Sequence, residues 1–423
     1  MTTTVNNEHK NIKVPNLRFP EFEGEWEELG LSELLDFKNG LNPKPDKFGK
    51  GIKFISVMDI LNNAVITYDC IKASVDVTEK ELSDFSVEKG DMLFQRSSET
   101  LEDVGRANVY MDDKTAVFGG FVIRGKKKGE YDPQYFNYLL RSPFARKRII
   151  PMGAGAQHFN IGQEGLSKVK LHFANIEEQK KIGKMLSLLD ERIATQNKII
   201  EDLKKLKSAI IEKVFCSPNQ KCPICRVEGF EQPLTTYKMN DFCSRIATKN
   251  KDSKCSLVLT IAAQYGLVNQ ESFFNKSVAS ENLTGYYLLH KGEFAYNRSY
   301  SAGYDWGAVK RLDNYDEGVL STLYICFKIN ETIVDSDYLA YYFESTKWHR
   351  GLSDIAGEGA RNHGLLNVSM TDYFNTKHRF PVIEEQKAIV KMLNAITEKE
   401  RKATLLGECY QKQKQYLLRQ MFI

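Results

Sequence analysis

An internal repeat, with its two copies roughly 205 residues apart, limits the folds that this chain can adopt. The pentapeptide IEEQK stands at residues 176–180 and again at residues 383–387. The segment GDMLFQRS at 90–97 aligns without a gap to GEFAYNRS at 292–299, and a Gly-x-Gly-Ala turn follows later in both halves. Because the matches keep the same order in both halves, we predict a duplicated fold.

The first part of each half, at residues 21–174 and 217–381, has the pattern of an α+β domain. Short apolar and aromatic runs separated by turn residues predict strands, for example at 118–123. Aromatic and aliphatic residues at helical spacing predict interleaved helices, for example at 133–148. Each half therefore begins with a globular domain of mixed structure.

The second part of each half predicts a long helix, at 175–216 and at 382–423. Asn175 is the expected N-cap of the first helix, and Gly407 makes the second helix less regular. In the first helix, mostly aliphatic residues alternate at spacings of four and three, which is a heptad seam. The seam consists of Ile182, Leu186, Leu189, Ile193, Gln196, Ile200, Leu203, Lys207, Ile210 and Val214.

A helix with such a seam needs a partner, and the second helix is the obvious one. We expect an antiparallel coiled coil that carries the two globular domains at opposite ends of a rod roughly 60 Å long. A parallel pair of helices would require the second domain to span the length of the rod. A helix that served only as a solvated linker would not need a heptad seam. The predicted order is an N-terminal tail at 1–20, a domain at 21–174, a helix at 175–216, a domain at 217–381 and a helix at 382–423.

The composition predicts a cytoplasmic protein that has no membrane anchor. No apolar run approaches the roughly 18 residues of a membrane span, and the N-terminus lacks the apolar core of a signal peptide. The eight cysteines are therefore expected to be reduced thiols. Cys222 and Cys225 form a CxxC pair with Cys216 and Cys243 nearby, which leaves either a zinc clip or a plain reduced linker open. A net charge of +4 permits a nucleic-acid partner without requiring one.

Signatures of catalysis are missing from the sequence. We find no Walker loop, no HExxH and no GxSxG, and no glycine-rich loop with an Asn-Pro-Pro-aromatic tetrad for methyl transfer. The histidines are scattered without ligand spacing. We therefore predict a chain that has no catalytic residues and binds no metal or cofactor itself.

Three features together resemble the specificity subunit of type I restriction-modification systems. These are the opening segment PNLRFPEF at 15–22 followed by Trp26, the repeated IEEQK, and the tandem order of globular domain and helix. The resemblance implies two target-recognition domains, each of which reads one half of a bipartite, asymmetric DNA sequence. It also implies that the helices dock two methyltransferase subunits and, through them, the restriction and translocase subunits. S-adenosylmethionine, ATP and magnesium would then belong to those partners.

Two repeated polar segments are the candidates for contact with double-stranded DNA. Arg can bind guanine edges, Gln and Asn can pair with adenine, and Ser can reach phosphate. The candidates are Gln95, Arg96 and Ser97, then Gln157, His158 and Asn160, and in the second half Asn297, Arg298 and Ser299, then Arg361, Asn362 and His363. An arginine that bridges loops inside the domain would explain the identical Arg equally well, and an ordinary surface turn would explain the histidines. Basic runs at 126–128 and 146–148 could neutralise phosphates or could be solvated charges.

Two other functions stay open at this point. The coiled coil could be a scaffold whose globular domains bind proteins, and salt-sensitive, sequence-selective DNA binding would distinguish the two. The second is a zinc-assisted nuclease centred on Cys222 and Cys225, although no histidine lies near this pair in the sequence.

The rod predicts that helix length sets the separation of the two half-sites. A rod of roughly 60 Å corresponds to at most about 18 base pairs. Inserting or deleting one heptad in both helices should therefore change the nonspecific spacer in the methylated sequence, which base-resolution methylation mapping would detect. An unchanged spacer would contradict the prediction.

Overall fold

The computed structural model describes residues 13–276, 282–299, 303–355, 366 and 368–423. The chain forms two compact units that do not follow the order of the sequence. Unit 1 consists of the chain up to Lys198 together with Thr404–Ile423, and unit 2 consists of Ile199–Ala403. Each unit therefore contains a globular domain and a part of both long helices.

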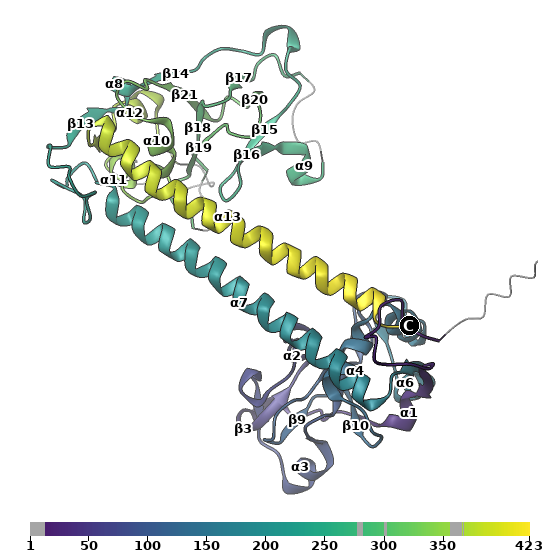
Figure 1. The fold of residues 1–423 in the computed structure, drawn as a ribbon. Coiled ribbons are helices and arrows are strands. Elements are labelled where there is room, and N and C mark those ends of the chain that lie inside the picture. Colours follow the sequence, from purple (N-terminus) through teal and green to yellow (C-terminus); the bar gives the residue numbers. More distant parts are fainter. Residues whose placement is uncertain (1–12, 277–281, 300–302, 356–365, 367) are drawn as a thin grey trace, which may run out of the picture. The chain divides into compact units, whose positions relative to one another are not determined.

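The two long helices expected from the sequence are α7, Ile176–Val214, and α13, Ile383–Gln420 (Figure 1). In unit 1 the beginning of α7 shares a core with the end of the chain, because Ile182 and Phe422 belong to one buried cluster. In unit 2 the end of α7 shares a core with the beginning of α13, as the clustering of Ile211 with Leu393 shows. The helices are therefore antiparallel within each unit, as predicted.

The heptad seam on α7 is the buried face of that helix. All ten seam positions are buried or half-buried, and most of the residues between them face solvent. Asn175 caps the helix as expected, because its side-chain oxygen accepts the Glu178 N–H at 2.9 Å. No helix in the described part of the chain combines the length and the apolar character of a membrane span.

In unit 1 the central sheet is antiparallel, with strand order β2-β10-β6-β8. A smaller sheet has the order β4-β3-β9-β5, and two-stranded pairs join β1 to β12 and β7 to β11. The strands are β1 Glu27–Gly30, β2 Leu35–Asn39, β3 Phe48–Ile55, β4 Ser74–Val75, β5 Ser86–Val87, β6 Met92–Gln95, β7 Ser97–Ser98, β8 Ala107–Val109, β9 Ala116–Phe118, β10 Val122–Lys127, β11 Phe159–Asn160 and β12 Lys170–Phe173. The short helices are α1 Leu31–Leu34, α2 Val57–Asn62, α3 Glu79–Phe85, α4 Pro133–Arg141, α5 Pro143–Ile149 and α6 Gln163–Ser167.

Unit 2 repeats the central sheet with the order β14-β21-β18-β19, and its pair β13-β22 repeats β1-β12. In the order of the chain, the pairs β15-β16 and β17-β20 take the place of the smaller sheet of unit 1. The strands are β13 Thr235–Lys238, β14 Cys243–Arg245, β15 Leu259–Ala262, β16 Gly266–Asn269, β17 Tyr287–His290, β18 Phe294–Asn297, β19 Ala308–Arg311, β20 Glu317–Leu320, β21 Ile325–Ile329 and β22 Lys377–Phe380. The short helices are α8 Met239–Phe242, α9 Gln270–Phe274, α10 Ser336–Tyr342, α11 His349–Ser353 and α12 Met370–Phe374.

Two local predictions were wrong in an informative way. Residues 118–123 are not one strand but the turn from β9 to β10, because two glycines at 119–120 interrupt the apolar run. Residues 133–148 are two helices instead of one. Ser142 caps α5 by accepting the Ala145 N–H at 3.2 Å, and Pro143 at the first helical position cannot continue α4.

The repeated IEEQK segment has the same contacts in both units. In unit 1 the buried Glu178 accepts two hydrogen bonds from the Arg18 guanidinium, both at 2.8 Å. Gln179 accepts the Asp132 N–H at 2.9 Å and donates to the Ala174 carbonyl at 2.8 Å. The motif thus ties the first turn of α7 to the N-terminal segment and to the beginning of α4.

In unit 2 the buried Glu385 is paired with Arg226 at 2.7–2.9 Å. Gln386 accepts the Asp335 N–H at 2.8 Å and donates to the Pro381 carbonyl at 2.9 Å. The segment around Arg226 is therefore the second copy of the segment around Arg18. The repeat is not evident when the two halves of the sequence are aligned, although both copies contain Pro-x-x-Arg.

A buried histidine distinguishes the two cores. His378 on β22 lies where unit 1 has Leu171, at the same register of the paired strand. Its ring nitrogens face the Tyr342 hydroxyl at 3.1 Å and the Thr376 hydroxyl at 2.9 Å, and complete burial lowers the pKa of His378 to about 3.

The buried neutral histidine predicts that unit 2 loses stability in acid. Below pH 6.5 the unfolded chain binds a proton at His378 that the folded chain does not, so the free energy of unfolding should fall by up to about 1.4 kcal/mol per pH unit as the pH decreases towards 3. His378→Leu should flatten this dependence in denaturant unfolding measured from pH 7.5 to pH 5. His290→Gln, at an exposed histidine of the same unit, is the control. An unchanged slope in His378→Leu would contradict the prediction.

Candidate nucleic-acid interface

Arg96 is the centre of a hydrogen-bonded frame in unit 1. Its N–H donates to the Phe121 carbonyl at 2.9 Å, and its carbonyl accepts the Ile161 N–H at 2.9 Å. Its Nη1 donates to the Gly120 carbonyl at 3.3 Å. Arg96 therefore joins the end of β6 to the β9–β10 turn and to the segment that follows β11.

Arg298 makes the equivalent frame in unit 2. Its carbonyl accepts the Leu366 N–H at 3.0 Å, its Nη2 donates to the Leu323 carbonyl at 3.2 Å, and its Nη1 donates to the Val368 carbonyl at 3.2 Å. The identical arginine thus has the loop-bridging role that the sequence left open. Both guanidiniums are half-buried.

The two predicted segments of the first half meet in unit 1. The pairing of β7 with β11 places Ser97 opposite Asn160, and the Ser97 hydroxyl donates to the Asn160 side-chain oxygen. The turn before β11 exposes Gln157 and His158. At Gly155, with φ +144°, a Cβ would lie 2.0 Å from the His158 carbonyl oxygen, so only glycine fits this turn.

The remaining candidates differ in how far the structure describes them. Gln95 is buried, and its amide nitrogen donates to the Ser97 carbonyl at 2.9 Å. Asn297 accepts the Ser299 N–H at 3.0 Å. Arg361, Asn362 and His363 lie outside the described residues.

The sequence analysis missed one apolar side chain in each frame. The Phe121 side chain is 69% exposed in the β9–β10 turn, and Leu323 is 60% exposed at the same register before β21. Phe121 is one of the residues that line a cavity of about 400 Å³, and Phe48, Phe54 and Met58 are among the others. No sequence signal marks these residues, because an apolar residue before a strand is normally assigned to the core.

Most residues of the basic runs are engaged in contacts within unit 1. Lys126 and Lys128 lie 3.5 Å and 3.2 Å from the carboxylates of Glu88 and Asp36. Arg146 donates to the carbonyls of Glu102 and Val104, at 2.8 and 2.7 Å. These contacts favour a structural role for the runs over phosphate binding.

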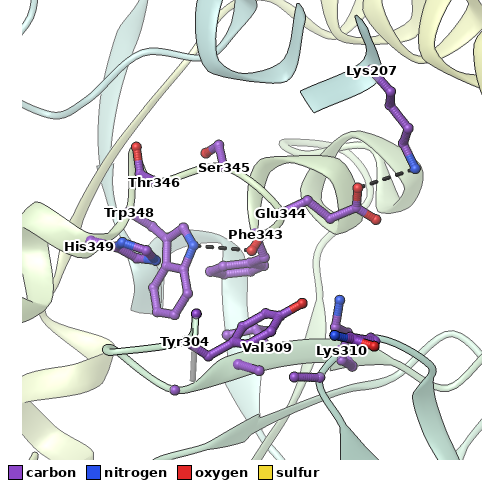
Figure 2. A pocket seen from close by; sticks show the side chains of 15 residues that line it. Lys207, Tyr304, Val309, Lys310, Phe343, Glu344, Ser345, Thr346, Trp348 and His349 are labelled. Atoms are coloured by element: carbon purple, nitrogen blue, oxygen red, sulfur yellow. Dashed lines mark hydrogen bonds and ion pairs between the residues drawn. The ribbon is translucent and has the colours of Figure 1, made fainter. Parts of the chain in front are cut away.

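A cavity of about 350 Å³ in unit 2 is lined by two lysines and one glutamate. Figure 2 shows Lys207 reaching Glu344 at 3.3 Å, with Lys310 pointing towards the same carboxylate. Burial lowers the pKa of Lys310. The arrangement of these charges gives the cavity no clear ligand chemistry.

The CxxC pair belongs to the second copy of the N-terminal segment. The Cys225 N–H donates to the Lys213 carbonyl near the end of α7 at 2.9 Å, and the Leu17 N–H donates to the Gln420 carbonyl at the end of α13 at 2.9 Å. Cys222 and Cys225 are exposed thiols. Within the described residues, no three Cys, His, Asp or Glu side chains are arranged to hold a metal ion.

Comparisons with known proteins point to one family. Residues 23–205 match the family model described as the type I restriction modification DNA specificity domain. The putative type I restriction enzyme MjaX specificity subunit of Methanocaldococcus jannaschii is 28% identical over 400 residues, covering 89% of this chain and 88% of its own length. The crystal structure of the type I restriction-modification S subunit from M. genitalium superposes with a TM-score of 0.54 at 16% identity, covering 97% of this chain and 99% of that one. A chain from a structural study of complex assembly in a type I system gives the same TM-score at 13% identity, covering 93% and 96%.

The contact made by Cys225 predicts that neither thiol of the CxxC pair is needed for stability. The residue contributes its N–H to the end of α7, and this contact survives a change of side chain. Replacing Cys222 and Cys225 together by Ser should leave the thermal unfolding midpoint unchanged, and metal analysis of the purified wild type should give zinc well below one equivalent. Stoichiometric zinc together with a lowered midpoint in the double variant would show that a metal clip exists after all.

Proposed function

The resemblance to the specificity subunits of type I restriction-modification systems is confirmed, and on this premise we propose that the chain is the sequence-specific DNA-binding subunit of such a complex. Each globular domain would read one half of a bipartite, asymmetric target. The observation that carries the proposal is the pair of Arg96 and Arg298 frames. One scaffold is used twice, and it presents different side chains in the two units, as two readers of different sequences require.

The proposed DNA contacts lie around these frames. In unit 1 the exposed Gln157, His158 and Asn160 offer hydrogen-bonding groups to base edges, and Ser97 lies beside them. Gln95 and Arg96 would act mainly by holding this surface, since their groups are engaged within the unit. In unit 2 the corresponding set is Asn297, Arg298 and Ser299 with Arg361, Asn362 and His363.

We further propose that the long helices dock two methyltransferase subunits. Exposed apolar side chains recur at helical spacing on α7, at Leu188, Ile199 and Leu206, and on α13, at Leu405 and Tyr416. Spacings of seven and eleven residues keep each set on one helix face, which suits a protein partner. The restriction and translocase subunits would join through the methyltransferases, and S-adenosylmethionine, ATP and magnesium would act there. This chain would be non-catalytic.

Exchange of one domain tests the division of labour. Replacing residues 217–381 by the matching domain of another specificity subunit should change one half of the methylated sequence and leave the other half unaltered, because each unit has its own core and its own frame. Base-resolution mapping of adenine methylation in cells that carry the complex is the measurement. A change in both halves would contradict independent reading, and methylation that ignores the exchange would favour a scaffold that binds only proteins.

A further inference from the structure

The arginine frames raise the question of what they hold in place. In both units the guanidinium donates to a carbonyl of the turn that precedes the second central strand, either β10 or β21. In both units that turn carries one large apolar side chain, Phe121 or Leu323, which is more than half exposed. The repeat has therefore kept an exposed apolar residue at one register while it changed the residue type.

The turn in unit 1 is built to be rigid. The Val122 N–H closes it on the Gly119 carbonyl at 2.8 Å. A Cβ at Gly120 would lie 1.9 Å from the Asn42 side-chain oxygen, and one at Gly119 would lie 2.6 Å from the Phe54 ring, so the surrounding chain is packed tightly against both positions. A turn held in this way already keeps the Phe121 side chain in solvent, so the binding of a partner requires no further ordering of the turn.

The turn in unit 2 is braced by different contacts. The Ser321 carbonyl accepts the Tyr324 N–H at 3.2 Å, and the Ser321 hydroxyl accepts the Leu323 N–H at 3.4 Å. The Tyr324 hydroxyl is 3.2 Å from the Thr260 hydroxyl. These contacts hold the turn that carries the exposed Leu323.

The surroundings of Phe121 favour DNA as the occupant. The Arg96 backbone joins the Phe121 turn directly to the strand that ends at Ser97, opposite Asn160. Phe121 lies beside this polar reading surface, together with the exposed Phe48 and Met58 that line the same cavity. An apolar side chain next to polar groups fits a groove, where base edges are polar and the faces of stacked bases are apolar. Phe and Leu are among the residues that enter base steps, and the contact offsets part of the cost of unstacking.

We infer that Phe121 and Leu323 are apolar wedges, each of which enters a base step in or beside the half-site of its own unit. This inference rests on the proposed function. Arg96 and Arg298 are then positioning residues that hold the wedges and need not touch DNA. The arginine, which both units share, holds the turn in place. The polar side chains, which differ between the units, read the sequence of each half-site.

Fluorescence of 2-aminopurine tests the wedges, because it rises when a base is unstacked. The complex of this chain with its methyltransferase subunits is bound to duplexes that carry the mapped target, labelled at single steps in and beside each half. The adenines that are methylated stay unlabelled. We expect a rise at one step in each half. Phe121→Ala should remove the rise in one half only and Leu323→Ala in the other, so that each variant is the control for its partner.

Affinity and its salt dependence separate a wedge from a phosphate contact. Loss of base stacking should weaken binding about 10-fold to 100-fold, while the slope of log K against log salt stays unchanged because no counterions are involved. Phe121→Leu should keep most of the affinity. Arg96→Lys, which keeps the charge, should reduce the fluorescence rise in the same half as Phe121→Ala.

Four outcomes would overturn the inference, and the last of them would also overturn the proposed function. Specific binding by the wild type without any rise in fluorescence would exclude the wedge and leave the proposed function intact, as would full affinity in both alanine variants. Loss of the methyltransferase subunits from Phe121→Ala would show that the residue is a protein contact. A wild-type complex that binds every sequence equally would refute the proposed function itself.

Discussion

A buried glutamate in the first turn of each long helix is the interaction on which the rest of the structure depends. Glu178 and Glu385 have almost no exposed surface, and each is neutralised by one arginine through two hydrogen bonds. A buried carboxylate without such a partner is strongly destabilising, by about 3–5 kcal/mol. Because the arginines come from segments distant in the chain, the pairs fix where each helix begins relative to its domain.

The glutamine that follows each glutamate extends this control to the core. Gln179 and Gln386 accept the N–H of the residue that caps α4 or α10. A tyrosine of each of these helices contacts the phenylalanine just beyond the end of the other long helix. Phe422 lies 5.5 Å from Tyr135, and Phe215 lies 5.0 Å from Tyr338, measured between ring centroids. Each unit is therefore closed by the start of one helix and the end of the other, which explains why the units do not follow the chain order.

The candidate interface shows how a duplicated scaffold can serve two readings. The identical arginines are engaged with backbone carbonyls, which have the same chemistry whatever the side chain. Variation is therefore free to accumulate in the turns that the arginines hold, such as Gln157 and His158 in unit 1. On this view the side chains that matter for specificity are those that the two units do not share.

The sequence by itself determined the duplication, the two long helices with the seam on α7, the mixed α+β domains and the family resemblance. These follow from residue patterns that are local or strictly repeated, and the IEEQK segment or the Asn175 cap can be recognised without knowing what lies beside it. Only the tertiary structure decided that Arg96 holds a loop, that the Cys222 segment repeats the N-terminal segment, and that Phe121 and Leu323 are exposed. Each of these features depends on which groups from distant parts of the chain meet. Arg96 and the Cys222 segment bind backbone carbonyls, which any residue could supply. The exposure of Phe121 and Leu323 is missed by hydropathy, which assigns apolar residues to the core. A pattern in the chain can predict an element, but the partner of a side chain is set by the packing of the whole unit.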